Sequence, residues 1–119
     1  METIDVNVEQ LAKEKRESYE IIKNGEDPKI SPIEDFIYIK ILFKCEHYEG
    51  REGSMLFRKK AIPSTDEELG REINKTICRK LCSCVYSIGH YIHYRKDDLW
   101  VVVIKEITHD PNKPHNKNK

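Results

Sequence analysis

The chain has 119 residues, which is enough for one domain of ordinary size. Hydrophobic residues make up 38% of it and charged residues 35%, so a modest core can form beneath a strongly charged surface. Its 21 basic residues balance 21 acidic ones, which argues against a protein that coats nucleic acid or anionic membrane through bulk charge.

The charges are unevenly distributed along the chain. Residues 1–35 contain ten acidic and five basic side chains, whereas residues 36–60 contain six basic and three acidic ones. An acidic arm over residues 1–30 therefore precedes a mildly basic body. Such an arm can be a solvated helix with its own salt bridges, or it can lie on the basic strands of its own or a second chain.

The first predicted element is a helix that begins after Asn7 and ends near Asn24–Gly25. Asn7 can cap the helix N-terminus, with Gln10 three residues later completing a capping box. Few apolar residues lie between these ends, so the buried stripe is thin and the helix should dock late or pack against a partner. The alternation of apolar residues over 3–8 also permits a short strand at the start.

Residues 35–62 are predicted to form a β-hairpin. The odd positions from Ile37 to Cys45 are all apolar and give the first strand one clean face. A turn with two glycines follows over residues 49–53, and residues 54–62 form the returning strand.

A second helix is predicted to begin at Ser64, with Glu67 completing a capping box, and to run as far as Ile88. Apolar residues at every fourth position from Leu69 form its buried stripe. Gly70 interrupts a helix at a cost of about 1 kcal/mol relative to alanine, which suggests that another backbone approaches closely there. Residues 90–95 and 99–107 then form a second hairpin.

These elements predict a single α+β domain over residues 1–108, with an antiparallel sheet of about four strands, an N-terminal helix and a long helix between the two hairpins. Residues 109–119 are predicted to be a disordered basic tail. One helix covers one face of such a sheet, and the other face needs its own cover. That face is predicted to carry Phe36, Tyr38, Leu42, Trp100, Val102 and Ile104.

An uncovered apolar face favours a homodimer or a partner surface. The two hairpins could pair within one chain or swap between chains.

Three of the four cysteines lie close together as Cys78, Cys82 and Cys84. Their C-x3-C-x-C spacing matches neither zinc ribbons nor ferredoxin-type runs, although three thiolates with His47 or His90 would suffice for zinc. The preferred interpretation is that they are small hydrophobic residues of a reduced protein, so no metal or cofactor is predicted. His90 and His93, three apart on a strand, should point to opposite sides.

Basic and aromatic residues alternate on the predicted strands, an arrangement that can hold phosphates and stack bases. A lysine-protected sheet edge has the same pattern. The candidates for binding a partner or nucleic acid are Tyr38, Lys40, Arg58, Lys60, Tyr94, Arg95 and Trp100.

The sequence contains no nucleophile elbow, no phosphate-binding glycine loop and no pair of carboxylates within a recognisable motif. A non-enzymatic protein is therefore predicted. We expect a small binding, inhibitor or adaptor protein that acts as a homodimer on a further protein partner. The alternative is a protein that binds nucleic acid or a nucleotide.

The location is also predicted from the sequence. The small size and the richness in Ile, Lys, Asn and Tyr suggest a viral or phage origin. The longest apolar run, residues 99–104, is too short to cross a bilayer, and the acidic start is unlike an export signal. A cytoplasmic protein without membrane association is therefore expected, in a host cell if it is viral.

Overall fold

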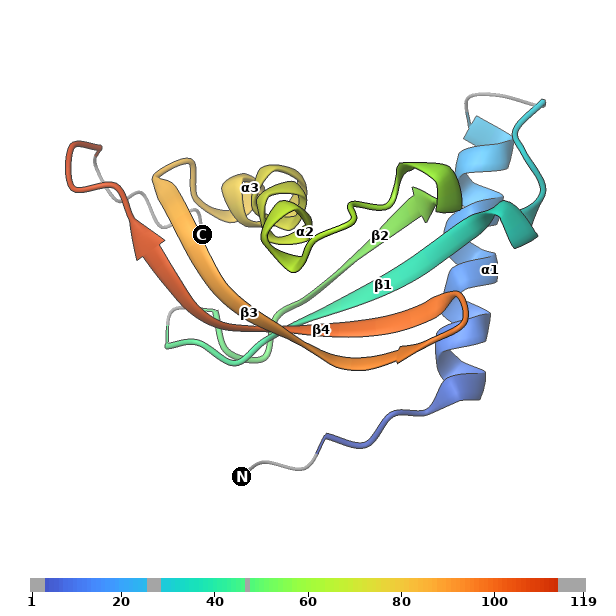
Figure 1. Ribbon diagram of the computed structural model, residues 1–119, viewed down its shortest axis with the longest axis horizontal. Coiled ribbons are helices and arrows are strands. Elements are labelled where there is room, and N and C mark those ends of the chain that lie inside the picture. Colours follow the sequence, from blue (N-terminus) through green and yellow to red (C-terminus); the bar gives the residue numbers. More distant parts are fainter. Residues whose placement is uncertain (1–3, 26–28, 47, 114–119) are drawn as a thin grey trace.

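A four-stranded sheet with helical segments on both of its faces forms the protein (Figure 1). The computed structural model describes residues 4–25, 29–46 and 48–113. In chain order the elements are α1 (Val8–Gly25), the 3-10 turn η1 (Ile33–Asp35), β1 (Phe36–Phe43), β2 (Glu52–Arg58), the 3-10 turn η2 (Lys59–Ala61), α2 (Asp66–Ile73), the π-helix η3 (Asn74–Cys78), α3 (Arg79–Leu81), β3 (Val85–Lys96) and β4 (Leu99–His109). The predicted α+β class with about four strands is confirmed.

The sheet is mixed, so the prediction of a purely antiparallel sheet is wrong. The strand order is β2-β1-β4-β3, and the two central strands, β1 and β4, are parallel. The helical segment returns the chain to the end of the sheet where β2 began, so β3 runs in the same direction as β2 at the opposite edge. Because β4 is antiparallel to β3, it is parallel to β1.

The main core lies between the sheet and the α2–α3 segment. β1 contributes its odd positions from Ile37 to Phe43, and α2 contributes Leu69 and Ile73. Trp100, Val102 and Ile104 were predicted to lie on the opposite face, and this assignment is wrong. The parallel register places each of them beside an odd position of β1 and therefore on the α2 side of the sheet. The pairs are Ile39 with Trp100, Ile41 with Val102 and Phe43 with Ile104.

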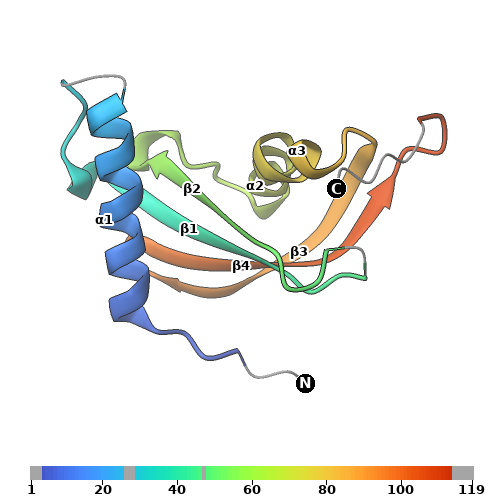
Figure 2. The ribbon, with the colours of Figure 1, turned by 180° about the vertical axis from the view of Figure 1, so that it is seen from behind.

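The second face of the sheet is covered by α1, which crosses one end of the strands (Figure 2). Leu11 of α1 packs against Tyr38 and Val101, and the exposed fractions of these three side chains are 5%, 2% and 3%. The ring of Tyr19 lies 5.8 Å from that of Phe36. α1 therefore covers this end of the face on which the predicted homodimer is based, and the homodimer itself stays a prediction.

Polar contacts hold the acidic arm to the sheet of its own chain. The ammonium of Lys15 lies 2.6 Å from the carboxylate of Asp98, and that of Lys40 lies 2.8 Å from Glu14. Asn7 accepts a hydrogen bond from the backbone N–H of Gln10 at 3.0 Å, which confirms the predicted cap. Residues 4–7 have no regular structure and the helix begins at Val8, so the structure favours the predicted helix over the alternative of a short strand at the start.

The middle helix is broken and shorter than predicted. Thr65, one residue later than expected, caps it by accepting a hydrogen bond from the N–H of Glu68 at 3.2 Å. The α-helix ends at Ile73, a π-helix follows, and the helical segment ends at Leu81. Residues 85–88 belong to β3, where Val85, Ser87 and Ile88 pair with β4 and so satisfy backbone groups that a helix would otherwise have paired.

The first part of the predicted tail belongs to the fold. His109 is the last residue of β4, and the N–H of Asp110 donates to the carbonyl of Cys84 at 2.7 Å. The rest of the predicted tail, 114–119, lies outside the described residues, as does His47. Among the described helices, none combines the length and apolar content that crossing a bilayer requires.

Candidate functional site

The predicted binding residues on the α1 side of the sheet are largely occupied within the chain. Tyr38 is buried and its hydroxyl donates to Glu14 at 2.9 Å, and burial raises its pKa to about 12. The ammonium of Lys40 is bound by the same carboxylate. Tyr94 packs against the cluster formed by Leu11, Tyr38 and Val101. Tyr38 and Lys40 are thus engaged within the chain, and Tyr94 is partly buried.

The remaining predicted residues lie elsewhere. The guanidinium of Arg58 stands 5.9 Å from the ring centroid of Phe36, and that of Arg95 stands 5.3 Å from the ring of Trp100. These are cation–π contacts within the chain. Lys60 is exposed in the 3-10 turn after β2. The seven predicted residues therefore do not converge on one surface.

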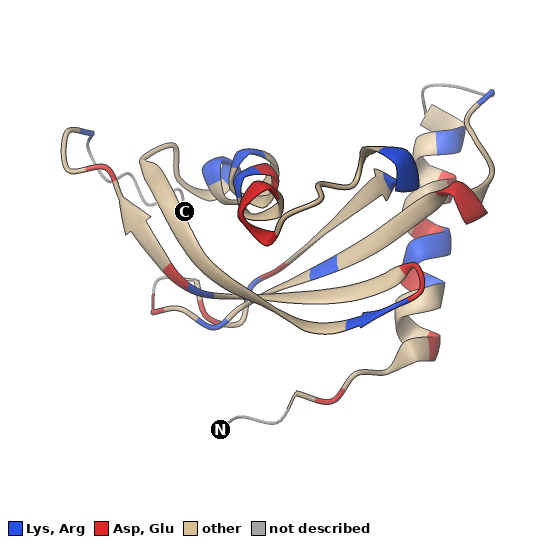
Figure 3. Cartoon of the chain, viewed as in Figure 1, with Lys and Arg blue, Asp and Glu red and all other residues tan. Residues whose placement is uncertain are grey.

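A different surface brings basic and aromatic side chains together. A cavity of about 530 Å³ lies between the α2–α3 segment and the start of β3. We call it the helix–β3 groove; its lining residues are Glu67, Gly70, Arg71, Asn74, Lys75, Arg79, Tyr86, Ser87, Ile88 and His90. Basic and acidic stretches alternate along the helical segment, with acidic residues at the start of α2 (Figure 3).

The helix–β3 groove has an excess of positive charge. Arg71, Lys75 and Arg79 line it against a single carboxylate, Glu67. Two other cavities, of about 380 and 690 Å³, are each lined by equal numbers of acidic and basic side chains. The groove is therefore the best suited of the three to an anionic ligand.

The groove cations are only weakly neutralised by the chain itself. Arg71 contacts Glu67 at 2.9 Å and Lys75 contacts Glu72 at 3.8 Å, and these side chains are between 43% and 79% exposed. Exposed pairs of this kind contribute about 0–1 kcal/mol, so a ligand can readily displace them. No ion pair within the described residues involves Arg79.

The π-helix places a buried amide at the base of this groove. Nδ2 of Asn74 donates to the backbone carbonyl of Tyr86 at 3.3 Å, which ties the helical segment to β3. Asn74 is 8% exposed, and its Oδ1 has no hydrogen-bond partner among the described residues. Single π-helical turns inside α-helices occur frequently at functional sites, because they displace side chains from the regular helical face.

Gly70 allows His90 to lie against α2. A Cβ at this position would come within 2.6 Å of Cε1 of His90. The predicted close approach at Gly70 is confirmed, but the neighbour is an imidazole ring and not a backbone. His93 instead contacts the carbonyl of Ile4 at 3.0 Å, so the two histidines lie on opposite faces as predicted.

We expect Gly70→Ala to destabilise the fold by about 1 kcal/mol. Overpacking against His90 costs roughly 1–3 kcal/mol, and the better helix propensity of alanine offsets about 1 kcal/mol of it. In a His90→Ala background the same substitution should become stabilising. Urea denaturation of the four proteins measures this coupling, and an equal effect of Gly70→Ala in both backgrounds would rule out the proposed contact.

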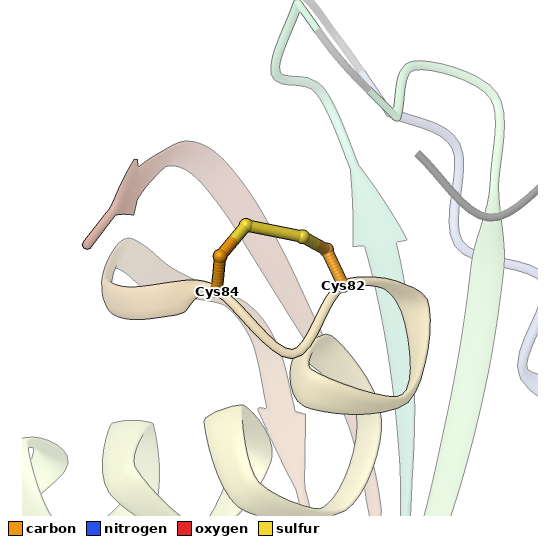
Figure 4. Close-up of a disulfide and its surroundings, with 2 residues drawn as sticks. All are labelled: Cys82 and Cys84. Carbon is orange, nitrogen blue, oxygen red and sulfur yellow. A yellow bond between two sulfur atoms is a disulfide. The ribbon is translucent and has the colours of Figure 1, made fainter. Parts of the chain in front are cut away.

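The cysteines divide into two pairs. Cys82 and Cys84 form a disulfide across the loop between α3 and β3 (Figure 4), so the prediction that all four are reduced is wrong for this pair. Cys45 and Cys78 are not part of a disulfide, and all four side chains are buried, as predicted. Burial, with a smaller contribution from Cys45, raises the pKa of Cys78 to about 12, which makes it a poor nucleophile.

Comparison of this chain with protein-family models, with curated proteins and with solved structures finds no match. Its function must therefore be argued from the chemistry of the site. The helix–β3 groove is the candidate that this chemistry favours.

Sequence reasoning missed this groove because its residues come from two elements. Arg71, Lys75 and Arg79 recur every fourth residue, which is a signal that the sequence contains. The facing residues Tyr86 and His90 were assigned to the end of the helix or to the hairpin, so they could not be placed opposite these cations.

Proposed function

We propose that the protein is a non-enzymatic binding protein whose helix–β3 groove takes a short segment of single-stranded nucleic acid. The observation that carries this proposal is the row of three weakly neutralised cations beside an exposed aromatic ring in one cavity. Proteins that bind single strands combine these two features, a basic groove for the backbone and aromatic side chains for the bases.

The spacing of the cations suits a phosphate backbone. Arg71, Lys75 and Arg79 recur every fourth residue and line one cavity, so a single backbone that passes through it can contact each of them in turn. The zero formal net charge argues against binding through the whole surface, so the contact should be local and involve few phosphates.

Tyr86 provides the stacking surface. It is 67% exposed although it belongs to β3 and lines the groove. Stacking of a base on an aromatic side chain contributes about 1–3 kcal/mol and tolerates any base. The bases of a duplex are already stacked on one another, which favours a single strand as the ligand.

The groove contains polar side chains without an assembled catalytic pair. Among the described residues, no hydrogen bond joins His90 to Ser87, so the nucleophile and base that group transfer requires are not paired.

Fluorescence anisotropy with a labelled oligothymidine of about ten nucleotides tests the proposal on the full chain. Arg79→Ala should weaken binding about tenfold or more, because a charge-assisted hydrogen bond contributes about 1.5–3 kcal/mol. Arg16→Ala, at an exposed position of α1, is the matched control and should bind as the wild type does. No binding by the wild type, or equal losses in the two variants, would refute the proposed site. Tighter binding of a duplex of the same length would refute the choice of a single strand.

A further inference from the structure

Cys82, Cys84 and His109 form a cluster of metal-ligating groups away from the groove lining. One potential ligand atom from each lies within 4.8 Å of the other two. Both cysteines are fully buried, and Nε2 of His109 is buried as well. The two sulfur atoms are joined as a disulfide across one intervening residue (Figure 4).

Three separate elements hold these ligands in place. The N–H of Cys82 donates to the carbonyl of Cys78 at 3.1 Å and so closes the last turn of the helical segment. The carbonyl of Cys84 accepts from Asp110, and Val85 pairs with His109 in the β3–β4 register. The histidine is therefore fixed beside the two cysteines by the sheet, although it lies 25 positions after Cys84 in the chain.

We propose that Cys82, Cys84 and His109 form a redox-gated zinc site, which binds Zn²⁺ when the disulfide is reduced and releases it when the disulfide forms. Two thiolates and an imidazole are ligands that zinc favours, and three protein ligands leave one tetrahedral position for water or another donor. The ligand atoms of the three residues lie within 4.8 Å of one another. After a small local adjustment, one ion between them can therefore form Zn–S and Zn–N bonds of about 2.3 and 2.0 Å.

The redox step balances with a dithiol as the reductant. The disulfide takes up two electrons and two protons, its S–S bond breaks, and the dithiol is oxidised to its own disulfide. Zinc then displaces the two thiol protons to solvent as the two Zn–S bonds form. Reoxidation by a disulfide reverses both steps: the two thiolates lose two electrons to it as their S–S bond forms again, and the ion is freed.

This ligand set differs from the one considered from the sequence. Cys78 was a candidate with Cys82 and Cys84, but it does not belong to the cluster, and His90 lies against α2 instead. His109 was assigned to a disordered tail, so its position at the end of β4 supplies the third ligand that the cysteine spacing alone could not indicate.

The test uses Co²⁺ as a spectroscopic probe for zinc on the full chain. After reduction by a dithiol and removal of the reductant, the wild type should bind one Co²⁺ per chain, with thiolate-to-cobalt charge-transfer absorption. The oxidised wild type should bind none. This comparison uses a single sequence and therefore does not depend on whether a variant folds.

His109→Ala identifies the third ligand, with His93→Ala as the matched control. Changing a residue that only hydrogen-bonds to a metal-ligating side chain lowers metal affinity roughly 10–100-fold. His109→Ala removes a metal ligand itself, so its loss of Co²⁺ affinity should be larger. In the reduced wild type, NMR signals of the His109 ring should shift on addition of Zn²⁺, whereas those of His93 should not. A reduced protein that binds no Co²⁺, unchanged affinity in folded His109→Ala, or unshifted His109 signals would overturn the proposal.

Discussion

Replacing Ile73 by alanine should destabilise the protein by about 2–5 kcal/mol. Ile73 is fully buried at the point where α2 meets the sheet, so the substitution removes apolar contacts and leaves a cavity between the two layers. Because a domain has a total stability of only about 5–15 kcal/mol, this single change should remove a large part of it. Chemical denaturation followed by circular dichroism measures the loss.

Ile73→Val is the matched control for this prediction. It removes one methylene and should cost about 0.5–1.5 kcal/mol. If Ile73→Ala cost no more than Ile73→Val, α2 would not be packed as described. Since the basic side chains of the helix–β3 groove depend on this packing, oligonucleotide binding should weaken in Ile73→Ala under conditions where the variant is partly unfolded.

The second large effect is expected at the contact between α1 and the β3–β4 turn. Lys15→Met should cost roughly 2–3 kcal/mol, because it leaves the carboxylate of Asp98 partly buried without its cation. This is less than the roughly 3–5 kcal/mol lost from fully buried pairs, since the Asp98 side chain is 31% exposed. Lys13→Met, at an exposed position of the same helix, should have little effect on the unfolding free energy.

The same contacts predict how stability depends on pH. Burial alone would raise the pKa values of Glu14 and Asp98, but hydrogen bonds and charge from Lys40 and Lys15, respectively, lower both below their ordinary values of 4.5 and 3.8. A lowered pKa in the folded state means that the stabilisation is present above these ordinary values. It is lost as the pH falls through the lowered values.

Lys15→Met should reduce this loss of stability in acid, because Asp98 then loses the cation that contributes most to lowering its pKa and, among cations, keeps only the weaker effect of Lys59. Unfolding free energies measured for the wild type and Lys15→Met between neutral pH and about pH 3 give the comparison. Identical pH profiles for the two proteins would contradict the assigned role of the Lys15–Asp98 pair.

Much of the fold could be predicted because local signals and tertiary structure agree. The Asn7 cap, the apolar odd positions of β1 and the turn glycines are encoded within a few residues, and the structure confirms the helix and the hairpins that they predict. The residues of β4 are apolar on both faces, a pattern typical of a central strand, and β4 is central.

The arrangement of the hairpins could not be read from local signals. Nothing within either hairpin specifies that β4, and not β3, pairs with β1, and this choice determines both the parallel pair and the face on which Trp100 lies. The π-helix is likewise joined to β3, by the hydrogen bond from Asn74 to Tyr86. The groove and the cysteine–histidine cluster were missed for the same reason, since each combines residues from separate elements.

The central claim is that Arg71, Lys75 and Arg79 bind the phosphates of a single strand. Its most direct test is the salt dependence of oligothymidine affinity for the wild type and for the variant with all three replaced by alanine. Three phosphate contacts predict a slope of about −2 in log affinity against log salt for the wild type, and a slope near zero for the variant. A wild-type affinity that is independent of salt, or an equal slope in the two proteins, would contradict the account.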